Sequence, residues 1–233
     1  MQKVMNFVLA LTAAAMTAGP AMAQKSKDTI KIGIIDTFHA LDSYHVPANE
    51  PGQYTRAIYG KLVIFNEHKA EFVPELAKSW KRMNPTTIEY ELRDDLTFSS
   101  GNKFTAEDVR YTLAYVGDPK LKIRFKRRYT WVKEVQVLSP HKIRIVAKKP
   151  KPDDMMSTAY RFYIYDSKEH KALKNKAMYG ALSASTTGVY MVVSINKNDG
   201  VRLTRHLAAA GKFPHRRALI KNVHGVPIPD RMT

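Results

Sequence analysis

Residues 90–109 read YELRDDLTFSSGNKFTAEDV and combine the marks of a strand, a tight turn and the start of a helix. Polar and apolar side chains alternate from Thr87 to Arg93, which is the period-two pattern of a half-buried strand. The small and polar residues 99–102 favour a turn. Thr105 and Asp108 are spaced as a capping box, so a helix is predicted to begin there. One face of that helix is predicted from the spacing of Val109, Thr112, Leu113 and Val116.

Similar patterns elsewhere in the chain predict a mixed α/β protein. A hairpin is expected where two alternating segments flank Ser139-Pro140-His141. Further strands are expected at 29–35, 62–65, 131–138, 142–148, 189–195 and 219–226, with Val201 and Leu203 continuing as the partner of the strand before them. Short helices are expected at 54–59 and around 155–163.

Two more helices are predicted from local signals. Leu76, Ala77 and Trp80 are spaced as one helical face that would pack on the sheet. Asp166 and Glu169 form a second capping-box pair, which predicts a helix running to about Tyr179.

The opening stretch also resembles the signature of a known family, the peptide- and nickel-type periplasmic solute-binding proteins of ABC importers (bacterial extracellular solute-binding family 5). That signature reads Leu-Arg-Asp-Gly-x-x-Phe-x-Asp-Gly-x-x-Phe/Leu-Thr-Ala-Glu-Asp-Val. The chain departs from it at Asp95 and Ser100, where the family has Gly and Asp. The matching residues are Leu92, Arg93, Asp94, Phe98, Gly101, Phe104, Thr105, Ala106, Glu107, Asp108 and Val109.

The resemblance extends from about Ile30 to Asp230, and it implies a fold of the type II periplasmic-binding-protein kind. Residues 186–190 and 228–230 are similar to the family's Gly-Thr-Gly-Pro-Tyr and Ile-Pro-Asp elements. Family members are considerably longer than this chain. Residues 24–233 are therefore expected to form a single, incomplete N-terminal lobe, with the second lobe and the C-terminal return segment absent.

A binding function is what the resemblance implies, rather than catalysis. The expected role is the substrate-binding component, or a truncated remnant of it, of an ABC importer for peptides or similar small solutes. Its partners would be the solute and the permease subunits, with no cofactor. In the family the loop after the first strand lies beside the ligand cleft, and its aromatic and acidic side chains could stack on a peptide and pair with its amino group. The candidate ligand-binding residues are Thr37, Phe38, His39, Leu41 and Asp42.

The N-terminus has the pattern of a cleavable export signal. Lys3 precedes an apolar run from Val4 to Met16, and Ala21-Met22-Ala23 fits the small-x-small cleavage rule. A membrane anchor needs about 20 apolar residues, and this run is shorter and is broken by Gly19-Pro20. Residues 1–23 are thus predicted to be a signal peptide, and the mature protein is expected to begin at Gln24 and to be periplasmic.

The composition also limits the kinds of bonding and catalysis that the protein can use. The chain has 233 residues, enough for a sizeable core, and no cysteine, which excludes disulfides, thiolate catalysis and cysteine-based zinc sites. The eight histidines are scattered, and a plain loop role is favoured over metal binding for His39 and His45. We find no nucleophile elbow or phosphate loop, and we predict that the protein is not an enzyme.

The charge of the chain leaves a second possible function open. The formal net charge is +17, and six cations fall between Lys120 and Arg128. Such a run is most often a solvated face or a strand with its lysines outward. It is also compatible with an exported protein that binds anionic surfaces or polymers. An export signal argues against nucleic acid as the partner.

Overall fold

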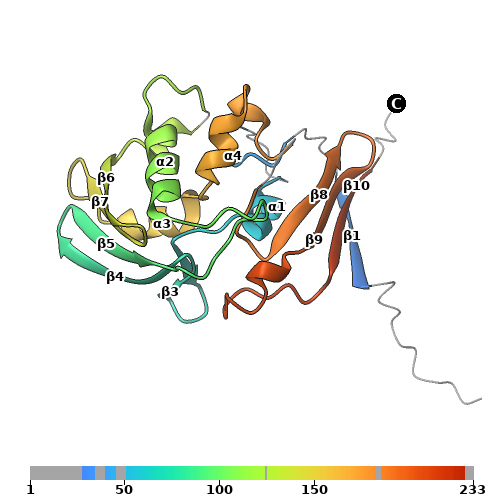
Figure 1. The fold of residues 1–233 in the computed structure, drawn as a ribbon, viewed down its shortest axis with the longest axis horizontal. Coiled ribbons are helices and arrows are strands. Elements are labelled where there is room, and N and C mark those ends of the chain that lie inside the picture. Colours follow the sequence, from blue (N-terminus) through green and yellow to red (C-terminus); the bar gives the residue numbers. More distant parts are fainter. Residues whose placement is uncertain (1–27, 35–39, 46–50, 124, 182–184, 229–233) are drawn as a thin grey trace, which may run out of the picture.

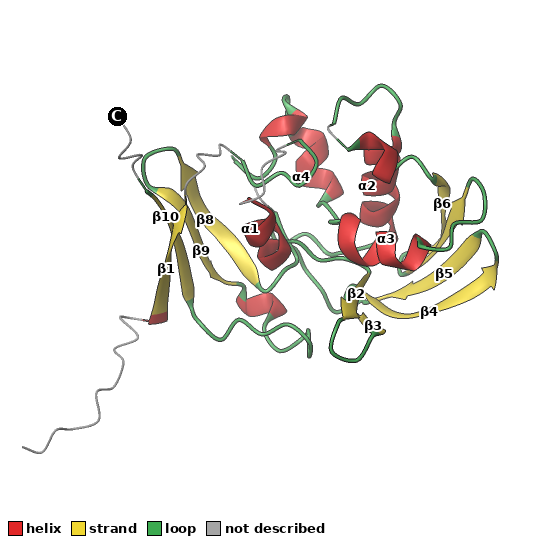
Figure 2. Ribbon diagram, turned by 180° about the vertical axis from the view of Figure 1, so that it is seen from behind, coloured by secondary structure: helices red, strands yellow, loops and turns green. Residues whose placement is uncertain are grey.

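The computed structural model describes residues 28–34, 40–45, 51–123, 125–181 and 185–228, and it shows a mixed α/β protein (Figure 1). Within this part the strands form two four-stranded sheets and one two-stranded sheet. The longer helices lie between the two larger sheets (Figure 2). Among the described residues, we find no helix with the length and hydrophobicity that a membrane span requires.

The first four-stranded sheet has the order β4-β5-β7-β6 and is antiparallel throughout. Strand β5, Thr87–Leu92, is the predicted strand of the opening stretch, and its Ile88, Tyr90 and Leu92 are buried. The predicted hairpin is present as β6, Val132–Ser139, and β7, Lys142–Ala147. Helix α2, Ala106–Gly117, packs on β6 and buries the four predicted face residues.

The predicted helix around Leu76, Ala77 and Trp80 is wrong, because Ala77–Asn84 is strand β4. Trp80 lies opposite Tyr90 in an antiparallel ladder with β5, and the ladder is irregular at two points. The side-chain Oδ1 of Asn84 accepts a hydrogen bond from the N–H of Thr86 at 2.9 Å, which closes the turn through Pro85. This turn fixes β4 as the partner of β5, and strand pairing outweighs the helical spacing of a short apolar run.

The second four-stranded sheet joins distant parts of the chain. Its order is β1-β10-β9-β8, with β1, Thr29–Ile34, parallel to β10, Asn222–Pro227. The hairpin of β8, Tyr190–Asn196, and β9, Gly200–Arg205, completes it. Gly200 has a φ of +79° at the turn, and an added Cβ would lie 1.9 Å from the carbonyl oxygen of Gly225, so no other residue fits.

Shorter elements connect these sheets. Helix α1, Pro51–Ile58, contacts β8, and the small sheet pairs β2, Val63–Asn66, with β3, Glu71–Pro74. Helix α3 spans Asp154–Arg161 and contacts β2. Single 3₁₀ turns occur at Lys126–Arg128, Lys176–Met178 and Leu207–Ala209.

Helix α4, Ser167–Ala172, is shorter than predicted. Asp166 caps it as expected, but the helix ends well before Tyr179. Asn175 accepts a hydrogen bond from the N–H of Ala177 and starts a separate 3₁₀ turn. The ammonium group of Lys176 donates to the carbonyl of Lys171 at 2.7 Å and caps the end of the helix.

Candidate functional site

The turn of the opening stretch is held by the buried carboxylate of Asp166. Its Oδ2 accepts hydrogen bonds from Ser100 Oγ at 2.7 Å, Asn102 Nδ2 at 2.9 Å and Ser185 Oγ at 2.7 Å. Its Oδ1 accepts the N–H groups of Lys168 and Glu169 at the start of α4. Burial disfavours the charge of this carboxylate, but these donors outweigh it and lower its pKa. Asp166 therefore joins the turn, helix α4 and residue 185.

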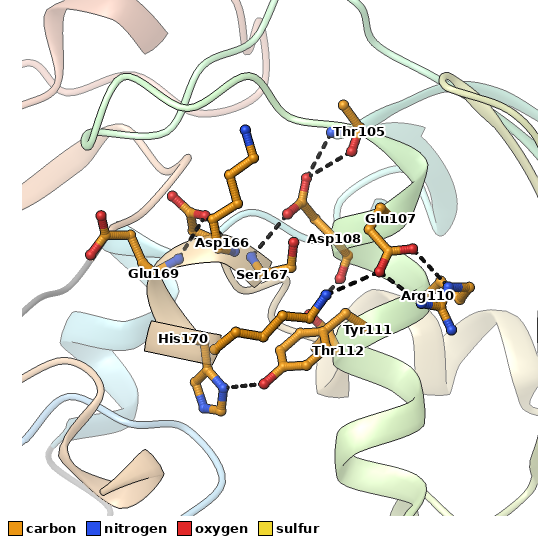
Figure 3. A network of polar contacts seen from close by, with 12 residues as sticks. Thr105, Glu107, Asp108, Arg110, Tyr111, Thr112, Asp166, Ser167, Glu169 and His170 are labelled. Atoms are coloured by element: carbon orange, nitrogen blue, oxygen red, sulfur yellow. Dashed lines mark hydrogen bonds and ion pairs between the residues drawn. The ribbon is translucent and has the colours of Figure 1, made fainter. Parts of the chain in front are cut away.

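Asp108 joins α2 to α4 in the same way (Figure 3). Its Oδ2 accepts the N–H of Thr105 at 2.8 Å, which confirms the predicted capping box, and its Oδ1 accepts the N–H of Ser167 at 2.9 Å. The preceding residue, Glu107, pairs with both Arg110 and Lys171. The two helices thus run side by side from a common start, and the signature residues serve to position them.

The predicted ligand-binding loop is described only in part. Thr37, Phe38 and His39 lie outside the described residues. Leu41 is buried in the core, and its N–H donates to the carbonyl of Gly180 at 3.3 Å. Asp42 is fully buried, so its carboxylate contacts other groups of the protein rather than solvent.

Asp42 holds the segment that follows it. Its Oδ1 accepts the N–H groups of Tyr44 at 2.7 Å and His45 at 2.8 Å, and its Oδ2 lies 3.1 Å from Nδ1 of His45. The other ring nitrogen of His45 lies 3.2 Å from the hydroxyl of Tyr115 on α2. A polar chain therefore runs from the predicted loop to helix α2.

Tyr111 and Tyr115 form a half-buried pair beside this chain, one turn apart on α2. The hydroxyl of Tyr111 lies 2.6 Å from Nδ1 of His170 on α4 (Figure 3), and the ring of Tyr115 meets the same histidine edge-on. Sequence reasoning missed these three residues, although the spacing of the two tyrosines was visible. No sequence pattern indicated His170, because its position in the structure depends on how α4 packs.

A second group of aromatic side chains is buried in the core and consists of Tyr44, Tyr59, Tyr165 and Tyr179. Their rings contact one another at centroid distances of 4.5–6.3 Å. Burial raises the pKa of each hydroxyl well above its usual value, so all four remain protonated. In the described ranges no group of three or more His, Asp or Glu side chains could hold a metal ion.

These features define a class of protein: a mixed α/β protein of the periplasmic-binding-protein type, in which a cluster of aromatic and histidine side chains lies beside the segment after β1. The family model of the bacterial extracellular solute-binding proteins, family 5, matches residues 71–231. The chain belongs to this family. A comparison with curated proteins found no match.

Solved structures show the same fold. NikZ from Campylobacter jejuni, solved with Ni(L-His), is 20% identical with a TM-score of 0.70, over 87% of this chain and 39% of NikZ. OppA of Burkholderia pseudomallei is 19% identical with a TM-score of 0.74, over 87% and 42%. The murein tripeptide-binding protein MppA in its open form is 22% identical with a TM-score of 0.75, again over 87% and 42%. The chain thus spans about two fifths of the length of these structures.

Proposed function

We propose that this chain takes part in capturing a peptide or a similar small solute for an ABC importer. The observation that carries the proposal is the family match over residues 71–231. Several similar structures are named for peptides, and one holds a nickel–histidine complex, so small polar solutes are the class to test. The permease subunits of the importer would be the protein partners.

The solute would meet the loop after β1, at Thr37, Phe38, His39, Leu41 and Asp42. The contacts of Asp42 suggest that the residues of this loop have different roles. Its carboxylate is occupied by the N–H groups of Tyr44 and His45, so it would hold the loop in place. Phe38 would supply direct stacking on the solute. The half-buried His45, Tyr111 and Tyr115 would line the adjoining surface.

Alanine at Phe38 or at Asp42 is expected to weaken binding roughly tenfold each, the usual loss for a central binding side chain. The probe is the tightest ligand found by calorimetry in a panel of short synthetic peptides and Ni(L-His). Asp42→Asn separates the two possible roles of Asp42. An amide oxygen can still accept both N–H groups, so a positioning residue tolerates this change, whereas a partner of a peptide ammonium does not.

The matched control is Glu71→Ala, which removes an exposed carboxylate on β3. Unchanged affinity in both Phe38→Ala and Asp42→Ala would remove the loop from the site. If the unaltered chain bound no member of the panel, the capture proposal itself would fail.

Export through a cleavable signal is part of the same proposal. Mass spectrometry of the protein from the bacterial envelope is expected to give Gln24 as the first residue, because cleavage after Ala21-Met22-Ala23 fits the small-x-small rule. An intact Met1 in the soluble cytoplasmic fraction would contradict the proposal.

A further inference from the structure

The loop after α2 carries a concentration of positive charge that the protein does not neutralise. We call residues 119–123 and 125–128 the basic loop. Within the described ranges, none of its five cations has a carboxylate at ion-pair distance, whereas Arg82, Arg93, Arg110, Arg144 and Arg202 all do. The five are Lys120, Lys122, Lys126, Arg127 and Arg128.

The basic loop is neither a strand nor a long helix, so its lysines do not form the outer face of a sheet. Lys126 folds inward, and its ammonium group donates to the carbonyls of Pro119 and Leu121. This closes the loop on itself. Lys120, Lys122 and Arg127 remain exposed to solvent.

An exposed aromatic ring stands among these cations. The side chain of Phe125 is 42% exposed, and the guanidinium carbon of Arg128 lies 3.9 Å from its ring centroid. Phe125 and the residues 126–128 line a hollow of about 390 Å³. The loop therefore presents an apolar ring and a positively charged hollow together.

Another exposed cation follows helix α4. Helices α2 and α4 start together at Asp108 and Ser167 and run side by side, so their ends lie at the same edge of the molecule (Figures 1 and 2). Lys174, just after α4, is exposed and has no carboxylate at ion-pair distance in the described part of the chain. The net charge of +17 gives the whole protein the same sign.

We propose that the basic loop docks this protein on the surface of an anionic lipid bilayer. Lysine and arginine side chains are attracted to anionic headgroups, and an aromatic ring among them can enter the interface. The hollow at Phe125 is lined by cations that can meet a headgroup phosphate. Nucleic acid fits less well, because the described residues of the loop offer no strand and no helix longer than a single 3₁₀ turn for a groove, and only one exposed aromatic ring.

The test is co-sedimentation of the full chain with vesicles at low salt. One set contains phosphatidylcholine alone, and the other contains equimolar phosphatidylcholine and phosphatidylglycerol. Binding is expected only to the anionic set and should fall steeply as salt is added. The loop variant K120Q/K122Q/R127Q/R128Q removes four cations and should lose about 600-fold in partitioning, since each cation near the surface contributes about fivefold. Phe125→Ser should weaken binding without changing its salt dependence.

The matched control is K81Q/K103Q/K149Q/K221Q, which removes the same charge from exposed lysines outside the loop. It is expected to lose at most about tenfold, and equal melting temperatures would show that both variants fold. An equal loss in both variants would overturn the proposal, as would equal binding to the uncharged vesicles. Retention on heparin without binding to anionic vesicles would also overturn it, in favour of a soluble anionic polymer. None of these outcomes depends on solute capture.

Discussion

Glu75→Ala is expected to lower the free energy of unfolding by about 3–5 kcal/mol, the usual cost of breaking a buried ion pair. Glu75 is 1% exposed, and one carboxylate oxygen pairs with the guanidinium of Arg216. The other accepts the N–H of Lys61 at 3.1 Å. The same guanidinium donates to the carbonyls of Tyr59 and Arg56.

The size of this effect follows from the positive charges around Glu75. Burial lowers the pKa of Arg216 to about 10. It also lowers the pKa of Lys61 to about 8, and Arg216 and Arg56 add to this lowering. Without the carboxylate of Glu75, these cations would repel one another in a poorly hydrated environment. The arginine would keep its charge but lose the group that compensates it.

Chemical denaturation of the two variants Glu75→Ala and Glu75→Gln measures this effect. The glutamine variant should lose less, because it keeps the shape and its amide oxygen can still accept the N–H of Lys61, although it loses the charge and the second acceptor oxygen. Glu71→Ala is the control, since its ion pair with Lys69 is exposed and 3.9 Å long, and it should change stability by no more than about 0.5 kcal/mol. A loss below about 1 kcal/mol in Glu75→Ala would contradict the argument.

The strand–turn–helix unit of residues 90–109 could be predicted because its signals are local. The alternation of β5, the capping box of Thr105 and Asp108 and the face of α2 each depend on residues within one or two turns. Strand β4 could not be predicted from its own residues. Its short apolar run fits a helix equally well, and pairing with β5 decides between them.

The candidate site is less predictable because it is made of distant parts of the chain. The loop was chosen by resemblance, and its acidic residue Asp42 proves to be buried. Its contact with α2 passes through His45 and Tyr115, which are 70 residues apart. His170 enters from a third element, 59 residues beyond Tyr111. Only the packing of α4 against α2 brings these residues together, and no periodic pattern in the sequence predicts that packing.

His170 is expected to make the protein less stable as the pH falls below neutral. Its ring is buried, and in the described part of the chain its Nε2 has no hydrogen-bond partner. Burial lowers its pKa from 6.5 to about 4, the neighbouring Lys176 and His45 act in the same direction, and Asp42 opposes them. The rings of Tyr111, Tyr115, Tyr165 and Tyr179 surround it.

The direction of the effect follows from proton binding in the two states. Above the unfolded pKa of 6.5, His170 is neutral whether the chain is folded or not. Between 6.5 and about 4 the unfolded chain binds a proton that the folded chain does not, so the unfolded state is favoured. From about pH 7 to about pH 5 this should remove about 2 kcal/mol of stability.

Urea unfolding of the unaltered chain and of His170→Gln at these two pH values tests the prediction. The variant should be less stable near pH 7, because the aromatic cluster loses a ring, but its stability should change less between the two pH values. A smaller dependence should remain, since burial also lowers the pKa of His206. His68→Gln, at an exposed turn, is the control and should keep the full dependence. If His170→Gln lost as much stability on acidification as the unaltered chain, His170 would not be the group that senses pH. Acidification would then have to act through another group.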